Sequence, residues 1–110
     1  MSRKSKGFRF ENKVKRIWQE KGYIVFRQAK SSFPDLIAFS KTIDLVILIE
    51  CKRNRVRKKE LDKMRELLKE LKLKNIYGII VTPNKHTYIP KPIIKEKTKR
   101  KRRKNVKNTT

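Results

Sequence analysis

Apolar residues at helical spacing mark two segments of the chain. The first apolar set falls at i, i+4, i+7 and i+8 and predicts a helix over about residues 8–21, ended by Gly22. A second set predicts a helix over about residues 58–73. We expect the apolar stripe of the first helix to lie in the core; it consists of Phe10, Val14, Ile17 and Trp18.

Runs of β-branched and aromatic residues between and after these helices predict five strands. The strongest run, Leu45 to Ile49, has five consecutive apolar residues, which is typical of a strand buried on both faces. The predicted strands cover residues 23–26, 33–39, 44–52, 76–82 and 86–89. The order α-β-β-β-α-β-β predicts an α/β fold in which helices flank a central mixed β-sheet.

The charge of the chain indicates that this α/β domain binds a polyanion. The 110 residues include 33 Lys or Arg and only 10 Asp or Glu, a formal net charge of +23. A domain this basic is drawn to nucleic acid through phosphate neutralisation and counterion release. We expect a basic arm at residues 1–6, one folded domain at 7–90, and a basic tail at 91–110 that is disordered without a partner.

Several other protein classes lack the residues that they need. No run of about 18 apolar residues predicts a membrane span, and the first residues lack the apolar stretch of a secretion signal. We therefore expect an intracellular protein, cytoplasmic or nucleoid-associated, with no membrane partner. A single cysteine, Cys51, excludes an intramolecular disulfide, and a single histidine, His86, leaves little material for a His-based metal site. The chain has no Gly-rich phosphate-binding motif.

The candidate chemistry lies where two predicted strands meet. Side chains alternate along a strand, so Glu50 and Lys52 point to one face and Cys51 to the other. If the strands at 33–39 and 44–52 pair through the tight turn between them, the pairing is antiparallel. The start of the first strand then lies opposite the end of the second, which brings Asp35 next to Glu50.

Two carboxylates and an ammonium in one place favour metal-dependent phosphodiester hydrolysis. Mg²⁺ prefers oxygen ligands, often a pair of carboxylates with waters and a substrate phosphate, and we expect Mn²⁺ to substitute for it. Lys52 would align the attacking water or stabilise charge on the phosphate, and Glu11 on the first helix is a further candidate ligand. The structural alternatives are an ion pair between Glu50 and Lys52, a turn role for Asp35 after proline, and a helix-surface role for Glu11.

These residues resemble a known nuclease superfamily. Glu11 on an N-terminal helix, Pro34-Asp35 on a strand and Glu50-Cys-Lys52 on the next strand look like the PD-(D/E)xK nucleases. The small basic chain is most similar to the archaeal-type Holliday junction resolvases over about residues 7–90. That similarity includes Gly7-Phe8-Arg9-Phe10-Glu11 and Arg27-Gln-Ala-Lys-Ser-Ser32.

The resemblance implies a restriction-endonuclease-like core and a Mg²⁺-dependent homodimer that makes paired cuts in four-way DNA junctions, in DNA recombination and repair. It implies catalytic roles for Glu11, Asp35, Glu50 and Lys52, with the three acids as metal ligands. The connection from Arg27 to Pro34 is shorter than in many such resolvases, and no apolar helix follows residue 90. A less structure-specific nicking or repair endonuclease of the same fold is therefore the nearest alternative.

Basic and hydroxyl residues around this site are the expected DNA contacts. The segment from Arg53 to Lys59 is dense in positive charge and directly follows the proposed site, so we expect it to bind the DNA backbone. The resemblance places Arg27 and Ser31 or Ser32 near the scissile strand. The full set is Arg9, Arg27, Lys30, Ser31, Ser32, Arg53, Arg55, Arg57 and Lys58. Two other functions stay open: a non-catalytic basic nucleic-acid-binding protein, and an RNA-processing nuclease that uses His86 and Tyr88.

Overall fold

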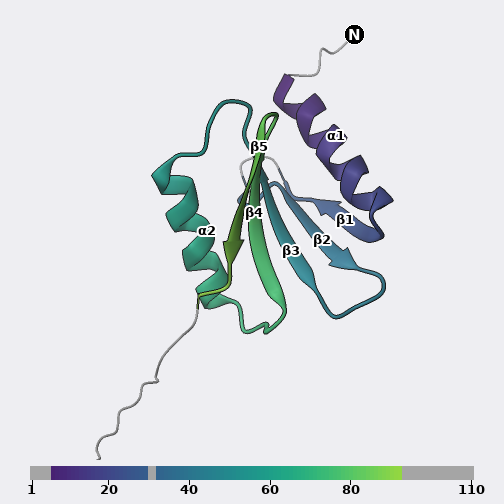
Figure 1. The fold of residues 1–110 in the computed structure, drawn as a ribbon, viewed down its shortest axis with the longest axis vertical. Coiled ribbons are helices and arrows are strands. Elements are labelled where there is room, and N and C mark those ends of the chain that lie inside the picture. The colour runs from purple at the N-terminus through teal and green to yellow at the C-terminus, as the bar shows by residue number, and fades with distance from the viewer. Residues whose placement is uncertain (1–5, 30–31, 93–110) are drawn as a thin grey trace, which may run out of the picture.

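The structure is a computed structural model that describes residues 6–29 and 32–92. The strands form one five-stranded sheet. Figure 1 shows helices α1 and α2 on opposite sides of this sheet. The elements in chain order are α1 (Lys6–Glu20), β1 (Tyr23–Arg27), β2 (Leu36–Ser40), β3 (Val46–Cys51), α2 (Lys58–Glu70), β4 (Ile76–Thr82) and β5 (Lys85–Pro90). This order confirms the predicted α/β fold with a mixed sheet. Within the described residues, no helix is long and apolar enough to cross a membrane.

The strands lie side by side in their chain order. β3 and β4 are parallel, since α2 carries the chain back to the same end of the sheet, and the other neighbouring pairs are antiparallel. The register sets Leu36 opposite Ile49 and Cys51 opposite Val81. The start of β2 and the ends of β3 and β4 therefore share one end of the sheet, where the chemistry is expected.

Helix α1 covers one face of the sheet. Val14 and Trp18 are buried there among residues of β1 to β4, as predicted, and Phe10 is half-buried. Gly22 ends the helix: its N–H donates to the Gln19 carbonyl at 3.1 Å, and its φ of +100° is rarely adopted by other residues. The predicted core role of Ile17 is wrong. Ile17 is 40% exposed, because it faces a groove between α1 and β4 and not the sheet itself.

Helix α2 covers the other face through Met64 and Leu68, which are fully buried against β3, β4 and β5. Gly78 on β4 permits this contact, because a Cβ at that position would lie 2.6 Å from Met64 Cγ. Lys91 Nζ donates to the carbonyls of Leu68 and Leu71 at 2.7 and 2.6 Å, which satisfies the C-terminal end of α2. Residue 91 of the predicted tail thus contacts the fold. Residues 1–5 of the predicted arm and 93–110 of the predicted tail lie outside the described residues.

Several element bounds differ from their predictions. Helix α1 begins at Lys6, and α2 ends at Glu70 because Leu71 adopts an extended backbone with φ −80° and ψ 133°. β2 begins at Leu36 and not at residue 33, since Pro34 has no N–H to donate to the ladder. β3 covers residues 46–51 and not 44–52. Asp35 therefore directly precedes β2, and Lys52 directly follows β3.

Candidate active site

Asp35 and Glu50 bind each other's backbone segments across the β2–β3 pair. The Asp35 N–H donates to Glu50 Oε1 at 3.1 Å, and the Cys51 N–H donates to Asp35 Oδ2 at 2.9 Å. This arrangement follows from the antiparallel register, because the Leu36–Ile49 pair brings the next residues on both strands together. The predicted meeting of the two carboxylates at one end of the sheet is confirmed.

Both carboxyl groups hold protons more tightly than usual. Burial raises the pKa of Glu50 to about 7, and the negative charge of Asp35 adds to this shift. Burial also raises the pKa of Asp35, against the lowering effects of the Cys51 N–H, of Glu50 and of the Lys52 charge. A nearby cation favours the charged form of a carboxyl group. The pair is therefore a place where added positive charge would be stabilising.

An acid that the sequence-based prediction missed holds Lys52. Lys52 Nζ lies 3.3 Å from Oε2 of Glu60, which is in the first turn of α2. Glu60 is only 6% exposed, and its Oε1 accepts the backbone N–H of Arg57 at 2.9 Å. Burial works to raise the pKa of Glu60, but the Arg57 N–H and Lys52 outweigh it and the pKa lies below its usual value. Glu60 thus stays charged. The structural alternative was an ion pair between Lys52 and Glu50. In the structure, Lys52 forms its ion pair with Glu60 instead.

Glu11 approaches the carboxylate pair from α1 but forms its ion pair with Arg27. Arg27 Nε lies 3.5 Å from Glu11 Oε1, and Arg27 Nη2 donates to Asn12 Oδ1. The guanidinium also lies over the Phe8 ring, 4.4 Å from its centroid. Burial raises the pKa of Glu11, the charge of Asp35 adds to the shift, and Arg27 opposes it. The charge of Asp35 therefore affects the pKa of Glu11, although the direct partner of Glu11 is Arg27.

The connection from β3 to α2 places positive charge beside the carboxylates. We call residues 53–57 the basic loop; Arg53, Arg55 and Arg57 in it are exposed. The loop, together with Cys51 and Lys52, lines a hollow of about 550 Å³. Glu60 fixes both ends of the loop, because it binds Lys52 just before it and Arg57 at its end. Exposed Arg side chains on a loop fixed at both ends are suited to binding the phosphate backbone of a nucleic acid.

Comparison with known proteins points to one family. The model of the archaeal Holliday junction resolvase family, Hjc, matches residues 2–104. The chain belongs to this family. The crystal structure of the Holliday junction resolvase Hjc from Archaeoglobus fulgidus, an archaeal hyperthermophile, has a similar fold. Its TM-score is 0.55, with 21% identity over 78% of this chain and 73% of that one.

A repair endonuclease from Pyrococcus abyssi also has a similar fold, with a TM-score of 0.52 and 18% identity over 76% of this chain and 40% of that one. No match was found among the curated proteins compared with the chain. Membership of the Hjc family confirms the resemblance to PD-(D/E)xK nucleases and the prediction of a nuclease of the Holliday junction resolvase type. The binding-only and RNA-processing alternatives gain no support from it.

The remaining predicted DNA contacts of this Hjc-family chain lie on different elements. Arg9 is exposed on α1, and Ser32 is exposed in the β1–β2 connection, where its N–H donates to the Ala29 carbonyl at 3.0 Å. Lys58 is exposed at the start of α2 and pairs with Asp62 at 3.0 Å. Lys30 and Ser31 lie outside the described residues.

The donor set of the site is a carboxylate pair. Among residues 6–29 and 32–92, no three or more His, Cys, Asp or Glu side chains are grouped so that they could hold a metal ion. Asp35 and Glu50 are brought together, whereas Glu11 is turned to Arg27. Mg²⁺ is often bound through one or two protein carboxylates, with waters and substrate phosphates as its other ligands. The pair fits such a cation.

Glu60 had a signal in the sequence that the prediction did not use. It is the third residue of a helix predicted to start at Lys58, three residues after Arg57. That is where the acid of a capping box accepts the backbone N–H of the residue before the helix. The contact between Glu60 and Lys52 needed in addition the packing of α2 against β3, which no local pattern supplies.

Proposed function

We propose that this Hjc-family chain hydrolyses DNA phosphodiesters at four-way junctions with a divalent cation, Mg²⁺ or Mn²⁺, held by Asp35 and Glu50. The observation that carries the proposal is the pair of hydrogen bonds that holds the two carboxylates together at the end of β2 and β3: Glu50 accepts the Asp35 N–H, and Asp35 accepts the Cys51 N–H. A protein that only binds DNA has no use for two half-buried acids beside its phosphate contacts, because desolvating them is costly and they repel phosphate.

Asp35 and Glu50 would be the protein ligands of the cation. Such a cation, when bound, polarises a phosphoryl oxygen and lowers the pKa of a water. The raised pKa of both carboxyl groups supports this assignment, since a cation would stabilise their charged forms. Backbone N–H groups hold one oxygen of each carboxylate, Asp35 Oδ2 and Glu50 Oε1, so both ligands are oriented in advance.

Lys52 would orient the attacking water or stabilise the charge that develops on the phosphate. Its charge is close enough to lower the pKa of both Asp35 and Glu50. An ammonium has three N–H donors, so Lys52 can bind Glu60 and still donate towards the substrate. Glu60 would then be a positioning residue that acts through Lys52.

Glu11 and Arg27 would act as a unit. Their ion pair keeps the Arg27 guanidinium beside the site, where it can meet the scissile strand. The influence of Asp35 on the pKa of Glu11 supports a role for Glu11 at the cation, directly or through a water. Of the four predicted catalytic residues, Glu11 is the one whose direct partner is a cationic side chain.

The basic loop would bind the DNA backbone beside the cut through Arg53, Arg55 and Arg57, with Lys58 directly after it. Phosphate contacts position a duplex without reading its sequence, which suits an enzyme that recognises the shape of a junction. The other proposed contacts are Arg9, Arg27, Lys30, Ser31 and Ser32.

A homodimer would supply the two active sites that paired incisions need. The described residues of one chain carry a single Asp35–Glu50 pair, so two cuts in one junction require two copies or two encounters. A two-fold dimer matches two symmetric cuts, because its two sites are related by the same operation. We place the enzyme inside the cell, where its DNA substrate lies.

The test compares a labelled four-way junction with a linear duplex of the same sequence, in Mg²⁺ or in EDTA. The wild type is expected to make paired cuts in the junction in Mg²⁺ and none in EDTA. Asp35→Asn and Glu50→Gln should slow cutting by about a hundredfold or more while junction binding persists. Glu70→Gln is the matched control, because it removes an exposed acid at the far end of α2.

Each other outcome is informative. Unchanged cutting by Asp35→Asn or Glu50→Gln would overturn the site. Equal cutting of junction and duplex would keep the nuclease and discard the preference for a junction. Full activity in EDTA would overturn the role of the cation.

A further inference from the structure

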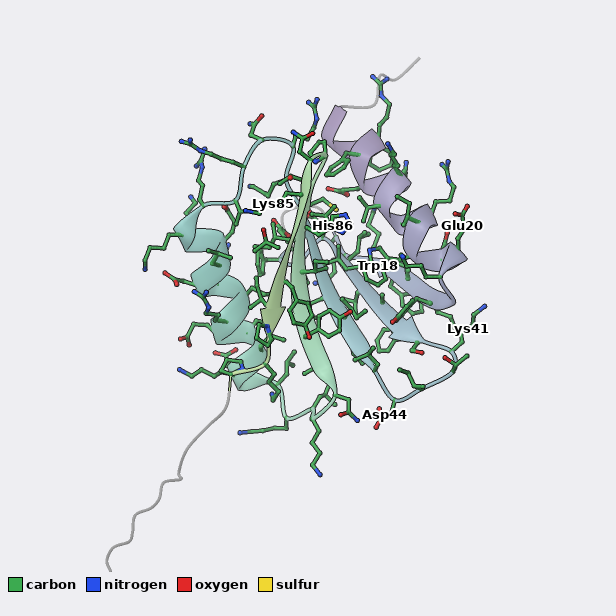
Figure 2. All side chains as sticks on the ribbon, viewed as in Figure 1. Trp18, Glu20, Lys41, Asp44, Lys85 and His86 are labelled. Carbon is green, nitrogen blue, oxygen red and sulfur yellow. The ribbon has the colours of Figure 1, made fainter. Side chains whose placement is uncertain are left out.

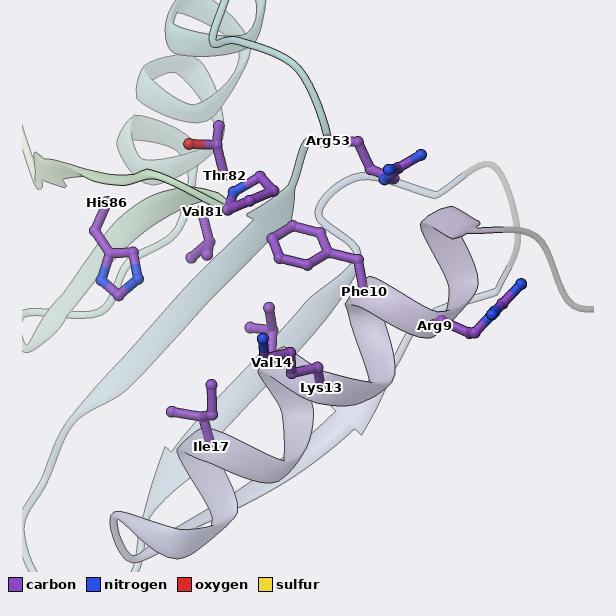
Figure 3. Close-up of a pocket in the computed structure, with 10 residues that line it drawn as sticks. Arg9, Phe10, Lys13, Val14, Ile17, Arg53, Val81, Thr82 and His86 are labelled. Carbon is purple, nitrogen blue, oxygen red and sulfur yellow. The ribbon is translucent and has the colours of Figure 1, made fainter.

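A groove beside the active site has an apolar floor. It lies between α1 and the ends of β3 and β4 (Figure 3). Its volume is about 580 Å³. Pockets that hold small ligands span about 300–1,000 Å³. We call it the α1–β4 groove. Its floor is formed by Phe10, Val14, Ile17, Val81 and Pro83.

Positive charge lines the same groove. Arg9, Lys13 and Arg53 are part of its lining, and no Asp or Glu is. Figure 3 shows Arg9 and Arg53 at one end of the groove and His86 at the other. An apolar floor with cationic side chains complements a ligand that joins a flat apolar ring to an anion. A nucleotide is such a ligand, because every base has a π-face and is attached to phosphate.

The α1–β4 groove adjoins the hollow lined by Lys52 and the basic loop, because Arg53 lines both. The Lys52 N–H donates to the carbonyl of Val81, a floor residue, at 2.9 Å. Arg53 directly follows Lys52, and Phe10 directly precedes Glu11, so two groove residues are chain neighbours of two residues of the proposed site. A DNA strand with its scissile phosphate at the carboxylate pair therefore has a neighbouring nucleotide beside the groove.

We propose that the α1–β4 groove takes an unpaired nucleotide of the DNA strand, next to the scissile phosphodiester. This inference rests on the proposed function. A base inside a duplex is stacked and paired, and it must leave the stack to reach the groove floor, which costs least for a base that is already unpaired. The groove thereby favours junctions with an unpaired nucleotide at the branch over fully paired junctions.

Ile17 is the residue through which this inference is tested. It is 40% exposed in the groove and lies outside the catalytic set. Ile17→Glu places a carboxylate where the base and its phosphate would lie, and Ile17→Ala shortens the floor without adding charge. The matched control is Ile43→Glu, since Ile43 is 63% exposed in the β2–β3 connection. Ile43 precedes Asp44, which lies at the opposite end of the sheet from His86 (Figure 2).

The measurement is the ratio of two dissociation constants, taken in EDTA. One junction carries a single unpaired 2-aminopurine at the branch, and the other is fully paired. The wild type and Ile43→Glu are expected to bind the first junction about tenfold more tightly, with a rise in 2-aminopurine fluorescence as the base leaves its stack. Ile17→Glu should abolish the difference, and Ile17→Ala should reduce it. Thermal unfolding checks that the variants are folded.

Cutting of the fully paired junction in Mg²⁺ separates this inference from the proposed function. Ile17→Glu should cut that junction at the wild-type rate, whereas failure of the proposed function would leave the wild type itself inactive. The inference is overturned if Ile17→Glu keeps the wild-type binding ratio. It is also overturned if Ile17→Glu, and not Ile43→Glu, lowers the sedimentation mass, because a second copy of this chain would then occupy the groove.

Discussion

The Lys52 ammonium lies 3.3 Å from Glu60, so α2 anchors the lysine of the proposed active site, although Lys52 itself directly follows β3. Glu60 is buried, and its second oxygen accepts the backbone N–H of Arg57. One carboxylate thus joins the end of β3, the basic loop and the first turn of α2. The position of Lys52 depends on how α2 packs on the sheet, which couples the active site to the core.

Substitution of Glu60 should lower the rate of cutting more than the affinity for DNA. Glu60→Gln keeps an acceptor for the Arg57 N–H but loses the charge that holds Lys52, and we expect kcat to fall about tenfold. Glu60→Ala removes both contacts and should cost on the order of a hundredfold, the effect of a misplaced catalytic group. Single-turnover cutting at saturating enzyme, with junction binding measured in parallel, separates the two effects.

Glu66→Gln is the control for this prediction, because Glu66 is an exposed acid on the same helix. It should cut like the wild type. Equal losses in Glu60→Gln and Glu66→Gln would mean that the net charge of α2 matters and the contact with Lys52 does not.

The pKa of Glu50 links stability to pH. This pKa is raised from 4.5 to about 7 in the folded protein, so between these values the folded state binds more protons than the unfolded state. The free energy of unfolding without metal must then fall as pH rises through this window. The raised pKa values of Asp35 and Glu11 act in the same direction.

Thermal unfolding in EDTA at pH 5 and pH 8 tests this link. The wild type should lose stability from pH 5 to pH 8, and Glu50→Gln should lose less, because its amide does not titrate. Added Mg²⁺ should stabilise the wild type more at pH 8 than at pH 5, since metal ligands must be deprotonated. A Glu50→Gln protein with the same pH dependence as the wild type would contradict the assignment.

The order of the elements along the chain and the meeting of Asp35 with Glu50 could be predicted from the sequence because both depend on local rules. A tight turn between two apolar runs fixes an antiparallel pair, and the pairing then brings the start of one strand to the end of the other. The side-chain alternation along β3 did not need the fold to be known. These rules predict the carboxylate pair without any tertiary information.

Contacts between elements could not be predicted in the same way. Glu60 reaches Lys52 only because α2 packs with its first turn at the end of β3. Ile17 belongs to the apolar stripe of α1, but it faces the α1–β4 groove and stays partly exposed. Lys91 lies between Pro90 and Pro92, directly after β5, yet its ammonium donates to carbonyls at the end of α2.

Gly78 should be required for the close approach of α2 to β4. A Cβ at this position would lie 2.6 Å from Met64 Cγ and 2.7 Å from Met64 Sδ, and Met64 is fully buried. Gly78→Ala should therefore destabilise the fold by about 1–3 kcal/mol, as overpacking does. Met64→Ala alone should cost about 2–5 kcal/mol, because it leaves a cavity.

The double variant tests whether these two effects share one contact. The alanine methyl at position 78 would partly fill the space that Met64→Ala vacates. The double variant should thus lose less stability than the sum of the two single losses, by on the order of 1 kcal/mol. Urea unfolding of all four proteins measures the coupling, and additive losses would show that the cost of Gly78→Ala does not come from its contact with Met64.

The basic loop should set how strongly junction binding depends on salt. Each phosphate contact releases counterions, so the slope of log K against log salt falls in magnitude by about 0.9 for each contact that is lost. Arg53→Gln with Arg55→Gln should reduce the slope by about two if both exposed side chains bind phosphate.

The control is Lys72→Gln with Lys74→Gln, which removes the same charge from exposed positions after the far end of α2. Filter binding over a range of salt concentrations should show no change of slope in the control. An equal change in both double variants would mean that the loop acts through the general field of the protein and not through direct phosphate contacts.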